Sequence, residues 1–322
     1  MRTAVLCGVT IVSVFFLSVA FAADDTQGDP PAPEAAAKEA AKPAGGAPVA
    51  PASSTTETAK PAEPAAEKAP PAKAAEPSAK ETAKPAKAGK SYGGGKFAVE
   101  PTFQDEFAPG WEKDQKAWRV ATWKQNGTQM SPERCATDGK GFLVQTVLAG
   151  EPYRGGSLQS VAEYPYGRWV GRLKPSSVPG VLNSFFTDDW DNMKTPEKDD
   201  GTKFEVDIEF LTYTFSKGKG QVHLALHGFG KKNVYVKEAE LDFNPSDDYH
   251  VYGFDILPTG IVWYADGKVI GEYKCPEGET VPDIAHEIFF NSWTSPKWIK
   301  GPPAAEAKYF IDWVQFYPLA KK

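Results

Sequence analysis

The chain has 322 residues, with 36 lysines and arginines against 42 aspartates and glutamates, and its formal net charge is −6. Alanine and proline are concentrated in the first third, so only the rest has the composition of a globular domain. The sequence contains no basic stripe, glycine-rich phosphate loop or Ser-His-Asp order. Nucleic-acid binding, nucleotide chemistry and ester hydrolysis therefore have little support.

Residues 1–22 predict an export signal. Arg2 precedes an apolar run that ends at Phe21, and Ala20-Phe21-Ala22 has the small-x-small pattern that signal peptidases cut. The alternative is an uncleaved membrane anchor, because the run is close to the length that spans a bilayer. We expect cleavage, and hence a secreted or periplasmic protein.

Residues 23–96 predict a disordered spacer. They consist mainly of Ala, Pro, Lys, Glu, Ser and Thr, which cannot fill a hydrophobic core. The Ala-Lys-Pro repeats favour extended, semi-rigid chain. The functional interpretation is a tether that associates the protein with a cell wall or envelope.

Residues 97–322 predict one folded domain, because all nine tryptophans lie between Trp111 and Trp313. Short runs rich in β-branched and aromatic residues alternate with turn signals, which indicates an all-β sandwich or jelly roll. The clearest predicted strands are residues 142–148, 168–174, 181–187, 204–211, 221–227, 250–256 and 309–316.

One hairpin and one edge strand are also predicted. Asp266-Gly267 separates two strand-like runs, 261–265 and 268–273, and supplies the positive φ angles of a two-residue hairpin turn. Residues 97–103 predict an edge strand near 309–316, so we expect the two ends of the domain to lie close together.

Two cysteines, Cys135 and Cys275, remain after removal of the export signal. An oxidising compartment would allow one disulfide between them, and the alternative is two separate buried thiols. Their spacing does not match a structural zinc site.

An acidic strand carries the chemistry. Residues 204–211 read Phe-Glu-Val-Asp-Ile-Glu-Phe-Leu, so Glu205, Asp207 and Glu209 line one face of a strand and the apolar residues between them line the other. A solvated acidic face and a calcium-binding row are the alternatives. Retaining glycoside hydrolysis gives the pattern a purpose, because it needs one ionised and one protonated carboxyl group roughly 5 to 5.5 Å apart.

Flat strand geometry does not bring the two glutamates together. Residues four apart on a strand have Cα atoms about 13 Å apart. A curved strand would let Glu205 and Glu209 lean toward each other past the shorter Asp207, which would then help to separate their pKa values.

The domain resembles glycoside hydrolase family 16, whose lichenase-like and xyloglucan-modifying members carry Glu-x-Asp-x-Glu on a concave strand. The single residue between Asp207 and Glu209 is typical of the regular-strand branch; the bulged branch, which includes laminarinases, agarases and carrageenases, has one more. Beside this motif, the resemblance rests on Tyr166-Gly167-Arg168-Trp169, Leu173-Lys174-Pro175, Gly180 to Phe186, Tyr249 to Asp255, Ile261 to Gly267, Asn291-Ser292-Trp293 and Ile311 to Val314.

The resemblance implies a concanavalin-like β-jelly-roll sandwich of two antiparallel sheets. It also implies that Glu205 is the nucleophile, Glu209 the general acid and then base, and Asp207 their assistant. The pH dependence of activity should then be bell-shaped, with its maximum on the acidic side of neutral. The positions that would contact sugar are Phe186, Asn291, Trp293, Ser157, Gln159 and His227.

Some of these positions depart from the lichenase pattern. Ser157 and Gln159 stand where an acidic residue and an arginine are expected, and Ala225 and His227 stand where Asn and Tyr are expected. The catalytic chemistry therefore looks retained while the glucan specificity does not. Trp190 and Trp298, in polar loops, are further candidates for stacking on sugar rings.

Asp312 resembles the carboxylate of a structural calcium site in some relatives. No cofactor is expected to be required. The leading interpretation is a monomeric, endo-acting retaining hydrolase of a β-linked polysaccharide, with β-1,3-1,4-glucan as the best guess. A transglycosylase using the same site and a non-catalytic, lectin-like sugar-binding module are the alternatives.

Overall fold

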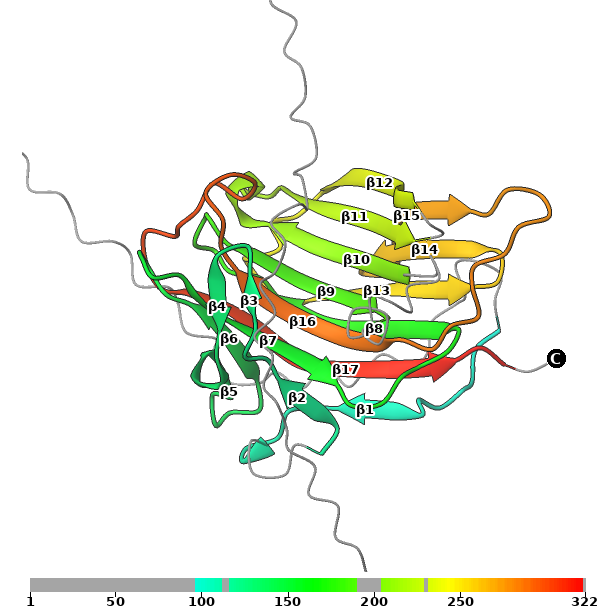
Figure 1. The fold of residues 1–322 in the computed structure, drawn as a ribbon, viewed down its shortest axis with the longest axis horizontal. Helices are drawn as coiled ribbons and strands as arrows, with labels where there is room; N and C mark the ends of the chain where they lie inside the picture. Colours follow the sequence, from blue (N-terminus) through cyan, green and yellow to red (C-terminus); the bar gives the residue numbers. More distant parts are fainter. Residues whose placement is uncertain (1–95, 112–115, 190–203, 229–230, 321–322) are drawn as a thin grey trace, which may run out of the picture. The chain divides into compact units, whose positions relative to one another are not determined.

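The computed structural model describes residues 96–111, 116–189, 204–228 and 231–320 (Figure 1). The predicted export signal and nearly all of the predicted spacer lie outside these residues. Within the part that is described, no helix is long and apolar enough to cross a membrane.

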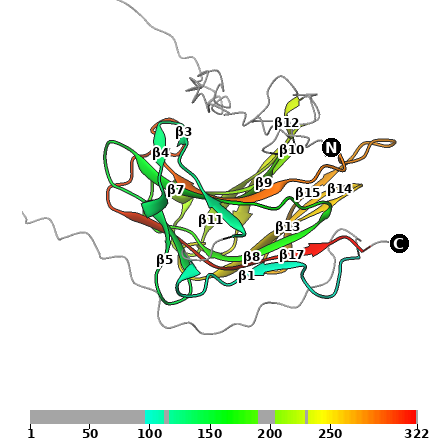
Figure 2. The same cartoon turned by 60° about the horizontal axis from the view of Figure 1, so that its bottom comes forward.

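Two β-sheets form the domain, and they lie as stacked layers (Figure 2). The nine-stranded sheet has the order β12 (Lys231–Leu241), β11 (Gly220–Gly228), β10 (Phe204–Leu211), β9 (Leu182–Asp188), β16 (Glu287–Trp293), β7 (Arg154–Ser160), β4 (Thr128–Met130) and β3 (Lys124–Gln125), with β2 (Trp118–Val120) also on β7. The eight-stranded sheet has the order β15 (Lys268–Lys274), β14 (Gly260–Ala265), β13 (His250–Leu257), β8 (Gly167–Lys174), β17 (Ala307–Pro318), β6 (Leu143–Val147) and β5 (Cys135–Thr137), with β1 (Phe103–Asp105) also on β17.

The prediction of an all-β sandwich is confirmed. Every described strand pairing is antiparallel except the parallel pairing between the short β4 and β7. The connections that are not strands include two short 3-10 turns, η2 (Pro132–Arg134) and η4 (Thr212–Thr214).

The core lies between the two sheets and is built from alternate residues of the strands. Trp169 and Trp263 project from the eight-stranded sheet, and Phe185, Ile208 and Phe290 project from the other; all five are fully buried. Burial of a side chain of this size stabilises the fold by about 1.5–3 kcal/mol. Packing of the apolar face of β10 thus fixes which of its side chains point away from the core.

The predicted hairpin is confirmed as β14 and β15. Asp266 and Gly267 have φ angles of 45° and 77°, as a two-residue turn with two positive φ angles requires. The ends of the domain also meet as predicted, because Phe103 pairs with Phe316. The predicted bounds of the N-terminal edge strand, 97–103, are wrong, since β1 covers Phe103–Asp105 and only an isolated bridge at Phe97 precedes it.

Cys135 and Cys275 are not joined by a disulfide. Cys135 lies in β5 and Cys275 directly follows β15, and these strands occupy opposite ends of the eight-stranded sheet. The two thiols are therefore too far apart to meet within one domain.

A buried ion pair joins β8 to β13 and should be important for stability. The Arg168 guanidinium donates two hydrogen bonds to the Asp255 carboxylate, at 2.6 and 2.8 Å, and the two side chains are 2% and 0% exposed. Replacing Asp255 with alanine would leave a buried guanidinium without its anion. We expect Asp255→Ala to lower the free energy of unfolding by about 3–5 kcal/mol, measured by urea denaturation. The double variant Arg168→Met/Asp255→Leu should recover most of this loss; an equal loss in both would contradict the explanation.

Candidate active site

Strand β10 presents three carboxyl groups on the side of the nine-stranded sheet that faces away from the core. Val206, Ile208 and Phe210 are fully buried in the core. Alternation along the strand therefore places Glu205, Asp207 and Glu209 on the opposite side. This side, defined by the three acids, is named the acidic face.

The neighbouring strands place further side chains on the acidic face, because residues that pair directly across a sheet share a face. Strand β9 lies on one side of β10 and β11 on the other. The cross-strand partners are Asp188 and His227 for Glu205, Phe186 and Ala225 for Asp207, and Ser184 and His223 for Glu209. The predicted positions Phe186 and His227 thus flank the acids.

Strand β16 brings the predicted Asn291 to this face, together with Phe289, which was not predicted, and the neighbouring β7 brings the predicted Ser157. The Phe289 ring stacks on Phe186, with centroids 4.8 Å apart and planes 18° apart. Asn291 pairs with Ser184 on β9 and with Ser157 on β7, and the Ser157 hydroxyl donates to the Asn291 side-chain oxygen. Ser157 and Asn291 are therefore hydrogen-bonded to each other, and they lie in the cross-strand row that contains Glu209 and Ser184.

Gln159 contacts a buried acid that the sequence analysis missed. Its amide donates to the Glu287 carboxylate at 3.1 Å, and an Arg119 nitrogen lies 3.7 Å from the same oxygen. Glu287 is only 2% exposed, and it pairs with Asp188 across the sheet. Alternation from Asn291 back to Glu287 would have placed this acid on the acidic face, had β16 been recognised as a strand.

Trp293 is more deeply buried than its predicted contact with sugar requires. It is 3% exposed and lies in a hydrophobic cluster with Leu182, Leu211 and Ile299. The ring centroids of Trp293 and Trp298 are 6.0 Å apart. Trp298 is only half-buried, so more of its surface is open to a ligand. Trp190 lies outside the described residues.

Burial changes the proton affinity of Asp207 and Glu209. It raises the pKa of Asp207 from 3.8 to about 6, with a further rise from the Glu205 charge and an opposing effect of His227, whose Nε2 lies 3.3 Å away. Burial, followed by the charges of Asp207 and Glu205, also raises the pKa of Glu209 well above its usual value. Glu209 is thus suited to hold a proton where an ordinary glutamate is ionised.

The raised pKa of Asp207 predicts a cost in stability. Between pH 3.8 and about 6 the folded protein binds more protons at this carboxyl than the unfolded chain does, so stability falls as pH rises through this window. We expect Asp207→Asn to be more stable than the wild type at pH 7, by about 1–3 kcal/mol. The gain should disappear at about pH 3.5, below both pKa values. Urea unfolding at the two pH values checks this, and a gain that is the same at both would contradict it.

The residues around Asp312 do not fit a calcium ion well. An Arg172 nitrogen lies 2.6 Å from the Asp312 carboxylate, so a cation already neutralises it. Among the described residues, no group of three or more His, Cys, Asp or Glu is arranged to hold a metal. We expect the midpoint of thermal unfolding to be the same in calcium and in EDTA; a rise that saturates with calcium would restore the site.

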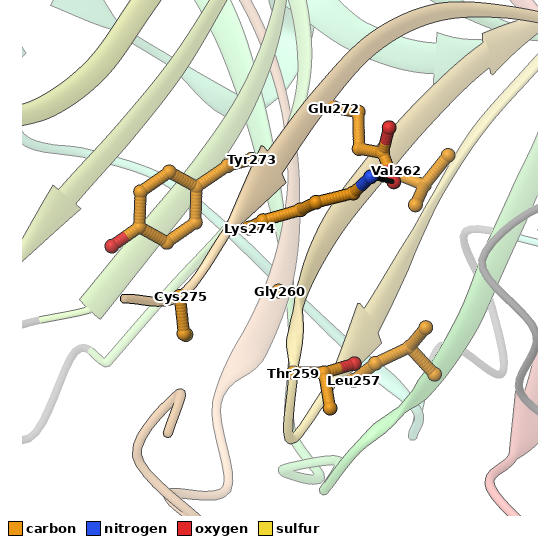
Figure 3. A pocket seen from close by; sticks show the side chains of 8 residues that line it. All are labelled: Leu257, Thr259, Gly260, Val262, Glu272, Tyr273, Lys274 and Cys275. Atoms are coloured by element: carbon orange, nitrogen blue, oxygen red, sulfur yellow. Dashed lines mark ion pairs between the residues drawn. The ribbon is translucent and has the colours of Figure 1, made fainter. Parts of the chain in front are cut away.

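A hollow of about 290 Å³ lies in the other sheet, at the end of β13 and along β14 and β15 (Figure 3). Glu272 and Lys274 form an ion pair at 3.5 Å beside it, and burial raises the pKa of the Cys275 thiol. This hollow contains neither a carboxyl pair nor an activated nucleophile, so the acidic face is the better candidate.

Comparison with known proteins agrees with the fold and with the predicted family. The family described as glycosyl hydrolases family 16 matches residues 110–315. A beta-glucanase of Bacillus subtilis (strain 168) is 30% identical over 200 residues, which cover 61% of this chain and 74% of that protein. The structure of the Bacillus licheniformis beta-glucanase superposes with a TM-score of 0.56 at 21% identity, over 69% of this chain and all of the other. The laminarinase catalytic domain from Thermotoga maritima gives 0.58 at 18% identity, over 69% and 99%. The chain belongs to glycosyl hydrolases family 16.

Proposed function

We propose that this protein is an endo-acting, retaining β-glucanase with Glu205, Asp207 and Glu209 as its catalytic residues. The observation that carries the proposal is the row of three acids on β10, of which Glu209 has a strongly raised pKa. Relatives named beta-glucanases, about 30% identical, support the substrate class.

In the first step, the Glu205 carboxylate attacks C1 of the sugar while Glu209 gives its proton to the glycosidic oxygen. The C1–O bond breaks, the shortened polymer leaves as an alcohol, and C1 becomes bonded to Glu205. In the second step, Glu209 takes a proton from water, whose oxygen attacks C1 and releases Glu205 as a carboxylate. Asp207, between the two glutamates, assists because its negative charge raises the pKa of Glu209.

The substrate is a neutral polysaccharide on this proposal. The described side chains on the acidic face include Asp188, Glu238 and Glu287 in addition to the three catalytic acids. Arg119, a cation beside this face, lies 3.7 Å from Glu287. An anionic polymer would be repelled from such a surface. The regular-strand motif, which resembles that of lichenase-like members, makes β-1,3-1,4-glucan the leading candidate, although Ser157, Gln159, Ala225 and His227 depart from the lichenase pattern.

Release of reducing ends from a set of polymers tests the proposal. We expect cleavage of barley β-1,3-1,4-glucan in preference to laminarin, xyloglucan, agarose and an acidic exopolysaccharide. Sizing of the products separates hydrolysis, which only shortens chains, from transglycosylation, which also lengthens them. Binding without release from any polymer would favour the non-catalytic sugar-binding module.

The proposal includes export, based on residues 1–22. We expect a mature protein that begins after Ala22 in the medium or periplasm, with residues 23–96 as a spacer between the enzyme and the cell wall or envelope. Amino-terminal sequencing of the fractionated protein checks this. Recovery of the full-length chain in the membrane fraction would instead support an uncleaved anchor.

A further inference from the structure

Two histidines on β11 each face a carboxyl group of the catalytic strand. His227 lies near Asp207, and the Nε2 atom of His223 lies 3.9 Å from Glu209 Oε2. The other ring nitrogen of His223 makes a much closer contact, 2.6 Å from Glu238 Oε1. His223 therefore stands between an acid on β12 and the proposed acid/base on β10.

Packing holds His223 in this position. It pairs with Glu238 on one neighbouring strand and with Glu209 on the other. Trp298 meets its ring edge to face, with centroids 5.6 Å apart and planes 82° apart. His223 is buried. The Glu238 side chain is 47% exposed, so water can solvate the negative charge of its carboxylate.

We propose that Glu238 and His223 act as a positioning pair that favours the protonated form of Glu209. In a neutral imidazole, a carboxylate that accepts the Nδ1 proton fixes the tautomer and leaves Nε2 as an acceptor. An acceptor that faces Glu209 favours the form of that carboxyl which carries a proton. At 3.9 Å the two groups interact electrostatically or through one water, and a direct hydrogen bond would require closer approach. This inference rests on the proposed function.

Other charged groups around Glu209 act on its pKa in both directions. The negative charges of Asp207, Glu205 and Glu238 raise its pKa, and His227 lowers it. Ser184 is its partner on β9 and does not titrate. Burial, and then the charge of Glu238, raises the pKa of Tyr213, and the Lys300 ammonium lies 4.2 Å from the centroid of the Tyr213 ring. Removal of the Glu238 charge should therefore lower the pKa of Glu209.

The test is the pH dependence of kcat/KM for Glu238→Gln and His223→Gln. We expect the alkaline limb of the bell to move to lower pH by about half a unit to one unit, so that activity on that limb falls about three- to tenfold. At pH values well below the limb, both variants should match the wild type. Glu240→Gln is the matched control, because Glu240 lies two residues along β12 and accepts a hydrogen bond from Gln221 instead of a histidine.

An unshifted limb in both variants, or a uniform loss at every pH, would overturn the inference, since a purely structural role lowers activity without moving the limb. Nitrogen NMR of the imidazole gives a readout that needs no substrate. His223 should be the Nδ1–H tautomer in the wild type and lose that preference in Glu238→Gln, and an unchanged tautomer would also overturn the inference. Inactivity of the wild type on every polymer would defeat the proposed function and leave the NMR result standing.

Discussion

Replacing Glu205 with glutamine should lower kcat on the β-glucan that the enzyme hydrolyses by about 10³- to 10⁵-fold. A glutamine amide cannot attack C1, so the glycosyl-enzyme intermediate does not form. Glutamine keeps the size of the side chain, and Glu205 lies on the solvent side of β10 between Asp188 and His227. The fold should therefore be unchanged, and binding of oligosaccharide should persist. Initial rates of reducing-end release measure the effect.

Chemical rescue makes this prediction specific to a nucleophile. In Glu205→Ala, azide can enter the space that the carboxylate occupied and attack C1 of a β-linked aryl glycoside, which yields the α-glycosyl azide. Glu272→Gln is the control for loss of one carboxylate, because Glu272 pairs with Lys274 in the other sheet. Wild-type rates in Glu205→Gln, or no azide product from Glu205→Ala, would remove Glu205 from this role.

The local pattern of the sequence was sufficient to predict the catalytic strand. Alternation over residues 204–211 predicted both its bounds and the direction of each side chain, and β10 has those bounds. The reason is that one face packs against a large core while the other does not, so a slip by one residue would bury three acids. Asp266-Gly267 predicted the hairpin for a similarly local reason, because few other dipeptides accept two positive φ angles.

The neighbours of the acids could not be predicted in the same way, because they depend on which strands pair and in what register. Asp188 and Glu287 reach the row of Glu205 only because β9 lies between β10 and β16. Separation of Cys135 from Cys275 follows from strand order in the same way. The partner of Asp312 is Arg172, which precedes it by 140 residues.

His223 shows how such non-local information changes a functional interpretation. As a residue in a sequence it is one of four histidines, and a surface or core role is the simplest explanation. Strand pairing places it between Glu209 and Glu238, which gives the imidazole a donor task at one nitrogen and an acceptor task at the other. The same chemistry could not be assigned from the spacing along β11 alone.

Removal of Glu209 should affect substrates according to their leaving groups. Glu209→Ala should hydrolyse β-glucan about 10²- to 10⁴-fold more slowly than the wild type, because a sugar alkoxide leaves poorly without a proton. An aryl β-glycoside with a 2,4-dinitrophenolate leaving group needs no such proton, so its first step should keep nearly the wild-type rate. Stopped-flow release of the phenolate measures this step.

The second step then distinguishes Glu209 from Glu205. Without a base to activate water, the glycosyl-enzyme intermediate should accumulate in Glu209→Ala, seen as a burst of phenolate followed by slow turnover. Azide, which needs no base, should attack that intermediate and yield the β-glycosyl azide, the opposite anomer to that expected from Glu205→Ala. Slow release of dinitrophenolate with no burst would contradict the role of Glu209 as the proton donor and base. In that case, the raised pKa that burial gives Glu209 would serve no catalytic purpose.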